Sequence, residues 1–155
     1  MQTLISRRAV LARGACLALG FSGLARLLHA GPFKTAMLVY KDPGCGCCEK
    51  WVELMRASGF AVAVRNTTDM QPIKRRYQVP PALASCHTAL VEGYVIEGHV
   101  PSDLIRKLLK EKPKVVGLTV PGMVTGSPGM EGPNPEPYQV LAFDVSGKTS
   151  VYAKR

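Results

Sequence analysis

Two groups of cysteine residues constrain this chain of 155 residues more than any other feature of its sequence. Cys45, Cys47 and Cys48 fall within four consecutive positions, and Cys86 is followed directly by His87. Spacing that tight is seldom a matter of core packing. Thiolate sulfur is the form of cysteine that attacks disulfides and binds soft metal ions such as Cu(I) and Zn(II). The fold of the chain therefore has to accommodate reactive sulfur chemistry at one place or at two.

The first 30 residues have the composition of an export signal. They contain no acidic residue, carry the pair Arg7 and Arg8, and continue into an apolar run over residues 14–25. A basic start, a short apolar run and a small residue such as Ala30 at the cut are typical of secretory signals, and the paired arginines resemble the twin-arginine type. The run is shorter than the about 20 apolar residues of a membrane span. We predict an export signal over residues 1–30 and a periplasmic mature domain over residues 31–155, free of the membrane, with an uncleaved anchor as the alternative.

Removal of this segment changes what the net charge implies. It takes away four of the 20 basic residues and none of the 11 acidic ones, which lowers the formal net charge from +9 to +5. The basic clusters at residues 74–76 and 107–114 contain no interleaved aromatic residues on which bases could stack. They are typical of solvated helix faces. Because an exported protein does not meet chromosomal DNA, we predict no nucleic-acid partner.

Short apolar runs and helical patterns alternate along the mature chain. The runs at residues 35–40 and 60–64 predict buried strands, and a helix is expected between them from about Cys47, capped by Gly59. The order β-α-β-α-β-β-α is typical of a compact layered α/β fold. The later elements that the pattern predicts are a helix over residues 69–77, a hairpin of residues 87–91 and 94–97, a helix from Pro101 to Pro113, and a closing hairpin of residues 138–143 and 149–153.

A long loop separates the last helix from the closing hairpin. Residues 121–137 contain five prolines and four glycines, so no regular element is expected there. The tripeptide Pro-Gly-Met occurs twice in this segment and places Met123 and Met130 in one loop. Thioethers bind Cu(I) well and Zn(II) poorly, which makes both residues candidate ligands. The alternative is that they fill gaps in the loop packing.

Cys45 and Cys48 form a C-x-x-C pair after the first strand of a βαβ pattern, which is the thioredoxin-like redox arrangement. The expected helix N-terminus favours ionised thiols there. A third thiol, Cys47, suits a thiophilic metal ion better than dithiol exchange. In a thioredoxin-like layout the proline turn at Pro80 lies beside such a pair, which would bring Cys86 and His87 close to it.

Three functions follow from these residues. The favoured one is a metal-binding protein that uses the clustered thiols, with His99 as a further candidate ligand ahead of the helix at Pro101. The second is a thiol–disulfide oxidoreductase whose catalytic pair is Cys45 and Cys48. The third is an interaction module held together by disulfides, because four cysteines in an oxidising compartment allow two of them.

The motifs also resemble a known family. The segments that carry the resemblance are residues 40–48 (YKDPGCGCC), 50–52, 79–97 (VPPALASCHTALVEGYVIE), 98–101 and 120–131. They are similar to the CopG-type family of exported copper-resistance proteins, long catalogued as a domain of unknown function. The resemblance implies a thioredoxin-like three-layer α/β fold, here with an added C-terminal loop and β-hairpin, and a periplasmic setting.

The same resemblance implies copper as the bound metal, with Cu(I) preferred to Zn(II), and other periplasmic copper-handling proteins as partners. It further implies a role in copper redox handling, which would make the protein a copper oxidoreductase. The ligands it implies are Cys45, Cys47, Cys48 and Cys86, followed by His87 and His99. One departure from ordinary thioredoxins is the segment Ala82 to Cys86, which separates the prolines from the next strand. This insertion argues against general disulfide-exchange activity.

Overall fold

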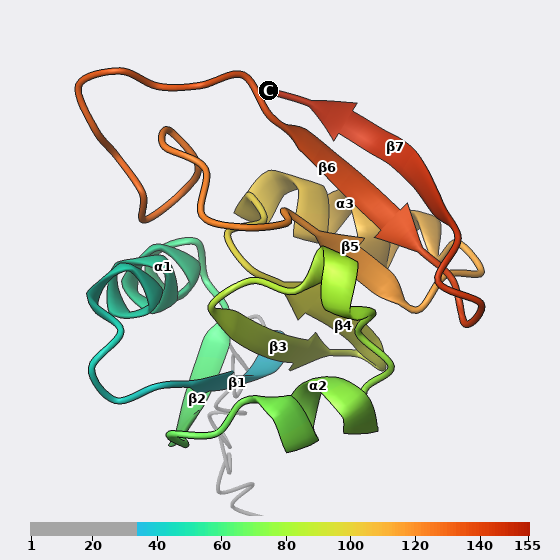
Figure 1. Cartoon of the computed structure of the whole chain (residues 1–155), viewed down its shortest axis with the longest axis horizontal. Coiled ribbons are helices and arrows are strands. Elements are labelled where there is room, and N and C mark those ends of the chain that lie inside the picture. Colours follow the sequence, from blue (N-terminus) through green and yellow to red (C-terminus); the bar gives the residue numbers. More distant parts are fainter. Residues whose placement is uncertain (1–33) are drawn as a thin grey trace, which may run out of the picture. The chain divides into compact units, whose positions relative to one another are not determined.

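The computed structural model describes residues 34–155, so the predicted export signal lies outside the described residues (Figure 1). No helix in the described range is long and apolar enough to cross a membrane. The elements are β1 (Ala36–Lys41), α1 (Gly46–Ala57), β2 (Ala61–Asn66), α2 (Gln71–Arg76), a short 3-10 helix (Pro81–Leu83), β3 (His87–Val91), β4 (Tyr94–Glu97), α3 (Ser102–Glu111), β5 (Gly117–Thr119), β6 (Gln139–Phe143) and β7 (Thr149–Lys154).

All seven strands of the described chain belong to one sheet with the order β2-β1-β3-β4-β5-β6-β7. β1 pairs with β2 in parallel, as a βαβ unit requires, and with β3 in antiparallel orientation. β4 and β5 are also parallel, with α3 between them in the sequence, while the other neighbours are antiparallel. The sheet is therefore mixed, and the predicted α/β class is confirmed.

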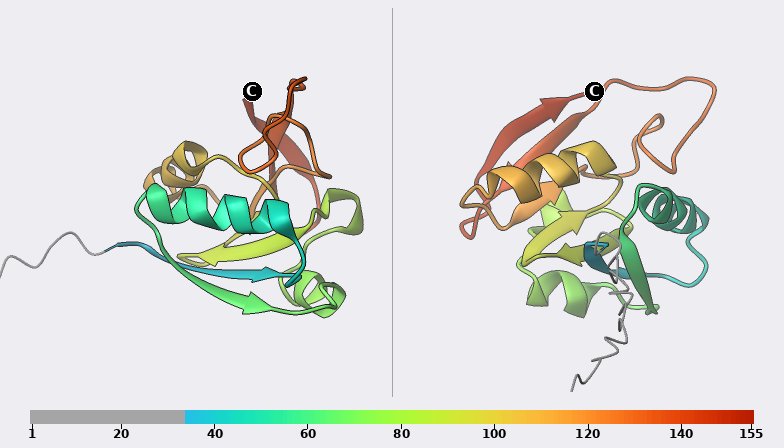
Figure 2. Two further views of the ribbon diagram at one scale, coloured as in Figure 1. Left: turned by 90° about the vertical axis from the view of Figure 1, so that its left-hand side faces the viewer. Right: turned by 180° about the vertical axis from the view of Figure 1, so that it is seen from behind.

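Helices cover both faces of the sheet and give the fold three layers. α1 and α3 lie on one face, and the shorter α2 lies on the other (Figure 2). The larger hydrophobic core forms under α1 and α3, from residues such as Trp51, Met55, Ile105 and Leu108, and a smaller one forms around Phe143. The predicted C-terminal loop and hairpin are present as well, since β6 and β7 extend the sheet.

The predicted elements near the cysteines are confirmed with small shifts at their ends. α1 buries Cys48, Trp51, Val52 and Met55, the i, i+3, i+4, i+7 spacing of an amphipathic helix. The helix is followed by Gly59, whose φ of +90° suits the left-handed position after a C-terminus. It begins one residue earlier than predicted, at Gly46, because Cys45 takes the N-cap position.

Three other elements differ from the prediction. α2 begins only at Gln71, whose backbone N–H donates to Asp69 Oδ1 over 2.9 Å. Pro101 occupies the N-cap of α3 instead of its first turn. The three residues of β5 form a strand that the sequence pattern does not predict, because so short a run carries no period. Their pairing with both β4 and β6 makes them a strand.

Candidate metal centre

The N-terminus of α1 carries three of the four cysteines of the described chain. Cys45 is the N-cap and forms a disulfide with Cys48, which the first helical turn brings beneath it. Cys47 is a free thiol, and its Sγ lies 3.5 Å from Cys45 Sγ. Cys48 is fully buried, whereas Cys45 and Cys47 are half-buried. The accessible sulfur at this helix end therefore comes from Cys45 and Cys47.

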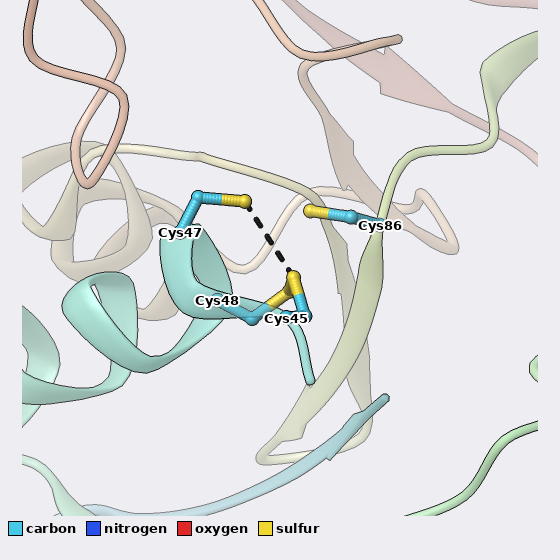
Figure 3. Close-up of side chains that lie close together, drawn as sticks. All are labelled: Cys45, Cys47, Cys48 and Cys86. Atoms are coloured by element: carbon cyan, nitrogen blue, oxygen red, sulfur yellow. Dashed lines mark hydrogen bonds between the residues drawn. A yellow bond between two sulfur atoms is a disulfide. The ribbon is translucent and has the colours of Figure 1, made fainter. Parts of the chain in front are cut away.

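Cys86 reaches this cluster from a distant part of the sequence. It lies just before β3, which pairs directly with β1, so the end of one strand and the start of the other meet beside the N-terminus of α1. The sulfur atoms of Cys45, Cys47, Cys48 and Cys86 all lie within 4.8 Å of one another, and Figure 3 shows Cys86 facing Cys47. The structure thus brings together the two groups of cysteines that the sequence separates.

A second group of potential ligands shares Cys86 with the first. Cys86 Sγ lies 3.0 Å from His99 Nε2 and 3.4 Å from His87 Nδ1, and both histidines are completely buried. His99 Nδ1 lies 2.8 Å from the carbonyl oxygen of Pro128, so this nitrogen donates and Nε2 keeps its lone pair toward Cys86. The candidate ligand His99 is thus buried beside Cys86.

His87 carries the one buried side-chain polar atom of the described residues that has no hydrogen-bond partner, its Nε2. Its ring packs against Trp51, with 4.4 Å between the ring centroids, and edge-on against His99. Buried polar atoms are normally hydrogen-bonded, and an unpartnered one is often part of a functional site. The imidazole of His87 is thus held in place by its neighbours while one nitrogen remains available.

Burial sets the protonation of this group. Burial, reinforced by the neighbouring Cys47 thiol, raises the pKa of the Cys86 thiol to about 12. Burial also lowers the pKa of His99 and, together with the nearby His99 ring and Lys74 ammonium group, holds the pKa of His87 well below its usual range. At neutral pH the imidazoles are therefore neutral, which is the form that binds metal ions. A metal ion that binds Cys86 has to displace the thiol proton.

The turn before α1 is held by local hydrogen bonds. Gly44 donates its backbone N–H to Asp42 Oδ1 over 2.7 Å, and Cys45 donates its N–H to the carbonyl oxygen of Asp42 over 3.1 Å. The ammonium group of Lys41, almost fully buried, pairs with Glu49 at 3.1 Å and donates to the same carbonyl. These bonds connect the end of β1 to the first turn of α1 and fix the position of the cysteines.

The two methionines of the Pro-Gly-Met repeats have different surroundings. Met123 is 60% exposed, so its thioether is not enclosed by the cluster. Met130 is half-buried and closes a turn by donating its N–H to the carbonyl oxygen of Ser127 over 2.8 Å. The preceding residue, Gly129, lies against the backbone of Cys47 and Trp51. The second repeat therefore lies at the end of α1 that carries the cysteines, whereas the first is hydrogen-bonded through Gly122 to Ala84 and Ser85, just before Cys86.

Sequence reasoning missed the buried charged residues beside the cluster. Lys74 was expected on a solvated helix face, and this is wrong: it is 5% exposed and forms an ion pair with the fully buried Glu97. Nothing in the basic run of residues 74–76 distinguishes the buried lysine from its exposed neighbours. A carboxylate on the facing strand, which only the fold reveals, is the reason for its burial.

Comparisons with known proteins agree with this geometry. The model of a protein family of unknown function, DUF411, matches residues 83–130, which include Cys86, His87 and His99. A comparison with curated protein sequences gave no significant match. Two solved structures, titled copper resistance protein CopG in Form 2 and Form 1, are 43% identical to the chain. Each match covers 79% of this chain and 98% of the solved one, with TM-scores of 0.75 and 0.74.

Identity at this level over nearly the whole length of the solved proteins exceeds what a shared fold alone produces. The similarity includes the sequence and the architecture together, and it agrees with the motifs around the cysteines. The chain belongs to the CopG family of copper resistance proteins.

Proposed function

We propose that the protein holds Cu(I) on the thiolates of Cys45, Cys47, Cys48 and Cys86 and serves in copper resistance. The observation that carries the proposal is the approach of all four sulfur atoms to within 4.8 Å of one another. Soft thiolate ligands select Cu(I), and several sulfurs at this spacing can share one ion or more. The similarity to proteins titled copper resistance protein CopG supports copper as the metal.

The copper-binding form differs from the disulfide form in two electrons. Reduction of the Cys45–Cys48 disulfide by a thiol reductant consumes two electrons and two protons and yields two thiols beside those of Cys47 and Cys86. Cu(I) then replaces the thiol protons, which leave to solvent. His87 and His99, which lie beside Cys86, are proposed as additional copper ligands. Met130 and Met123 are proposed as outer thioether ligands.

The cellular setting belongs to the same proposal. We infer that residues 1–30 are a twin-arginine-type export signal and that residues 31–155 are a thioredoxin-like metal-binding domain in the periplasm. Copper ions and other periplasmic copper-handling proteins are the proposed partners, and conversion between copper oxidation states is the proposed enzymatic role. The basic start and short apolar run of the first 30 residues support export.

Titration of the reduced protein with Cu(I) in the presence of a competing chelator tests the proposal. We expect tight binding that falls at least about tenfold in Cys45→Ser/Cys48→Ser and in Cys86→Ser, because each removes thiolate ligands. Cys16→Ser in the full-length chain is the matched control and should leave the affinity unchanged. Unchanged affinity in the Cys45→Ser/Cys48→Ser variant would reject the cluster as the copper site.

A second candidate function is thiol–disulfide exchange, favoured by the disulfide at the N-terminus of α1. Cys45 is the accessible sulfur of the pair and would attack, while the buried Cys48 would resolve the mixed disulfide. The metal-free protein should then reduce insulin, and Cys48→Ser should trap a mixed disulfide with substrate. Absence of both results, together with tight Cu(I) binding, would leave copper binding as the function.

A further inference from the structure

The carboxylate of Glu97 is completely buried at the end of β4 and is surrounded by donors. Its Oε1 accepts from the Nζ of Lys74 in α2 and from the backbone N–H of Ser85 over 2.7 Å. Its Oε2 accepts from Thr88 Oγ1 over 2.6 Å, and Lys74 Nζ also lies 3.3 Å from Thr88 Oγ1. Both oxygens and the ammonium group are therefore engaged within one small network.

Two members of this network flank Cys86 in the sequence. Ser85 precedes Cys86, and Thr88 is the residue of β3 that lies directly opposite Glu97 in the sheet. On the other strand, Glu97 stands two residues before His99. One carboxylate thus connects the two chain segments that carry the Cys86 sulfur and the His99 imidazole, whose atoms lie 3.0 Å apart.

Stability alone gives a weak reason for such a pair. Burying two charges costs desolvation energy that their attraction often fails to offset, and apolar replacements of similar volume are frequently as stable. The best-attested use of a buried ion pair is to specify one arrangement over others. Here the arrangement specified is the register between the Ser85–Cys86 segment and the end of β4, where the backbone N–H of Ser85 donates to Glu97.

We propose that the Lys74–Glu97 ion pair is a positioning device that holds Cys86 against His99 and thereby sets the copper affinity of the site. Neither residue touches the metal, and both act through Cys86. The inference rests on the proposed function, in which Cys86 is a copper ligand. Residues that orient metal ligands without touching the metal typically contribute about 10- to 100-fold to affinity.

A double-mutant cycle on the reduced protein tests this role. Glu97→Gln keeps the shape of the side chain but replaces one acceptor oxygen with an NH2 group, which cannot accept from its present donor. We expect the Cu(I) affinity to fall about tenfold or more. In a Cys86→Ser background the same substitution should change the affinity by less than about twofold, because the group that it positions is gone. Glu111→Gln, which breaks the exposed ion pair with Lys107, is the matched control and should have no effect in either background.

A milder variant keeps the test valid if Glu97→Gln folds poorly. Thr88→Val removes one hydrogen bond to Glu97 and should lower the affinity less, with the same dependence on Cys86. Circular dichroism of each variant reports whether the fold is intact. Where Cys86→Ser itself lowers the Cu(I) affinity, equal losses from Glu97→Gln with and without Cys86, or no loss in folded Glu97→Gln and Thr88→Val, would overturn the positioning role.

A readout without metal separates this inference from the proposed function. In oxidised Cys47→Ser protein, Cys86 is the one free thiol of the described residues, and its alkylation by iodoacetamide reports how firmly the segment is held. Glu97→Gln should accelerate that reaction several-fold, because a segment that is held less firmly exposes its thiol more often, and Glu111→Gln should not. Faster alkylation combined with Cys86-independent copper binding would reject Cys86 as a ligand and keep the positioning role. Unchanged alkylation would reject the positioning role.

Discussion

Gly98 lies in the chain between Glu97, which forms the buried ion pair, and His99, which lies beside Cys86. Its φ of +70° lies in the left-handed region, and its backbone N–H donates to the carbonyl oxygen of His87 over 3.0 Å. A Cβ at this position would lie 2.5 Å from the side chain of Ser85 and 2.8 Å from the carbonyl oxygen of Val120. Both the backbone conformation and the space around it therefore require glycine.

Gly98→Ala should lower the free energy of unfolding by more than the about 1–3 kcal/mol that a left-handed alanine costs, because the clash with Ser85 adds to it. The matched control is Gly93→Ala, where φ is +86° but nothing lies within 4 Å of the added Cβ. Urea unfolding of both variants measures the difference. Equal losses of stability would show that the Ser85 segment moves away from the added methyl group without a measurable cost in free energy.

The loop between β5 and β6 is the element that closes the candidate metal centre from outside the sheet. Gly129 in this loop approaches the N-terminal part of α1 so closely that a Cβ would lie 2.9 Å from the carbonyl oxygen of Cys47 and from the backbone nitrogen of Trp51. The neighbouring carbonyl of Pro128 accepts from His99. The loop is thus docked on the helix end that carries the cysteines and orients one of the histidines.

Gly129→Ala should displace this loop, break the bond between Pro128 and His99, and weaken Cu(I) binding several-fold in a chelator competition. The comparison is Gly93→Ala in the turn between β3 and β4, where φ is +86° and nothing lies within 4 Å of the added Cβ. Only backbone strain of about 1–3 kcal/mol is expected there, and copper affinity should be retained. A similar loss of affinity in both variants would contradict the docking of the loop at Gly129.

We expect the C-terminal hairpin of β6 and β7 to unfold in one cooperative transition with the part that carries the cysteines, because the two share a hydrophobic core. Val140 of β6 is fully buried and packs in the larger core, whereas Val145 in the turn of the hairpin is 80% exposed. Val140→Ala should cost about 1–3 kcal/mol of global stability, while Val145→Ala should stay within about 0.5 kcal/mol. Denaturant unfolding should remain a single transition in both. A separate early transition in Val140→Ala would show that the hairpin unfolds independently.

Copper binding should stabilise the whole molecule, because the ligands converge only in the folded chain. At free Cu(I) of about 100 times the dissociation constant, linkage adds about 2.7 kcal/mol, or roughly 10 °C in melting temperature. Reduced wild-type protein should show this shift in thermal scans followed by circular dichroism. Cys45→Ser/Cys48→Ser should lose most of it, and an undiminished shift in that variant would place the copper elsewhere.

The sequence by itself determined the local elements and the chemistry of the cysteines. The helix from Gly46 to Ala57 follows from the spacing of its buried residues, and the hairpin of β3 and β4 follows from two β-prone runs around Glu92-Gly93, both with positive φ. These features depend on side-chain periodicity and turn geometry, which act over a few residues. The motifs around the cysteines were also sufficient to indicate the family.

Only the tertiary structure decided which distant residues meet. The approach of Cys86 to Cys47 depends on the pairing of β3 with β1, and the burial of His99 depends on a loop some 30 residues further along, which meets it at Pro128. Burial of Lys74 depends likewise on a carboxylate in β4. Contacts between distant segments leave no period in the sequence, so a buried lysine and an exposed one have the same local pattern. The sulfur atoms of the two cysteine groups therefore form one site because β3 pairs with β1.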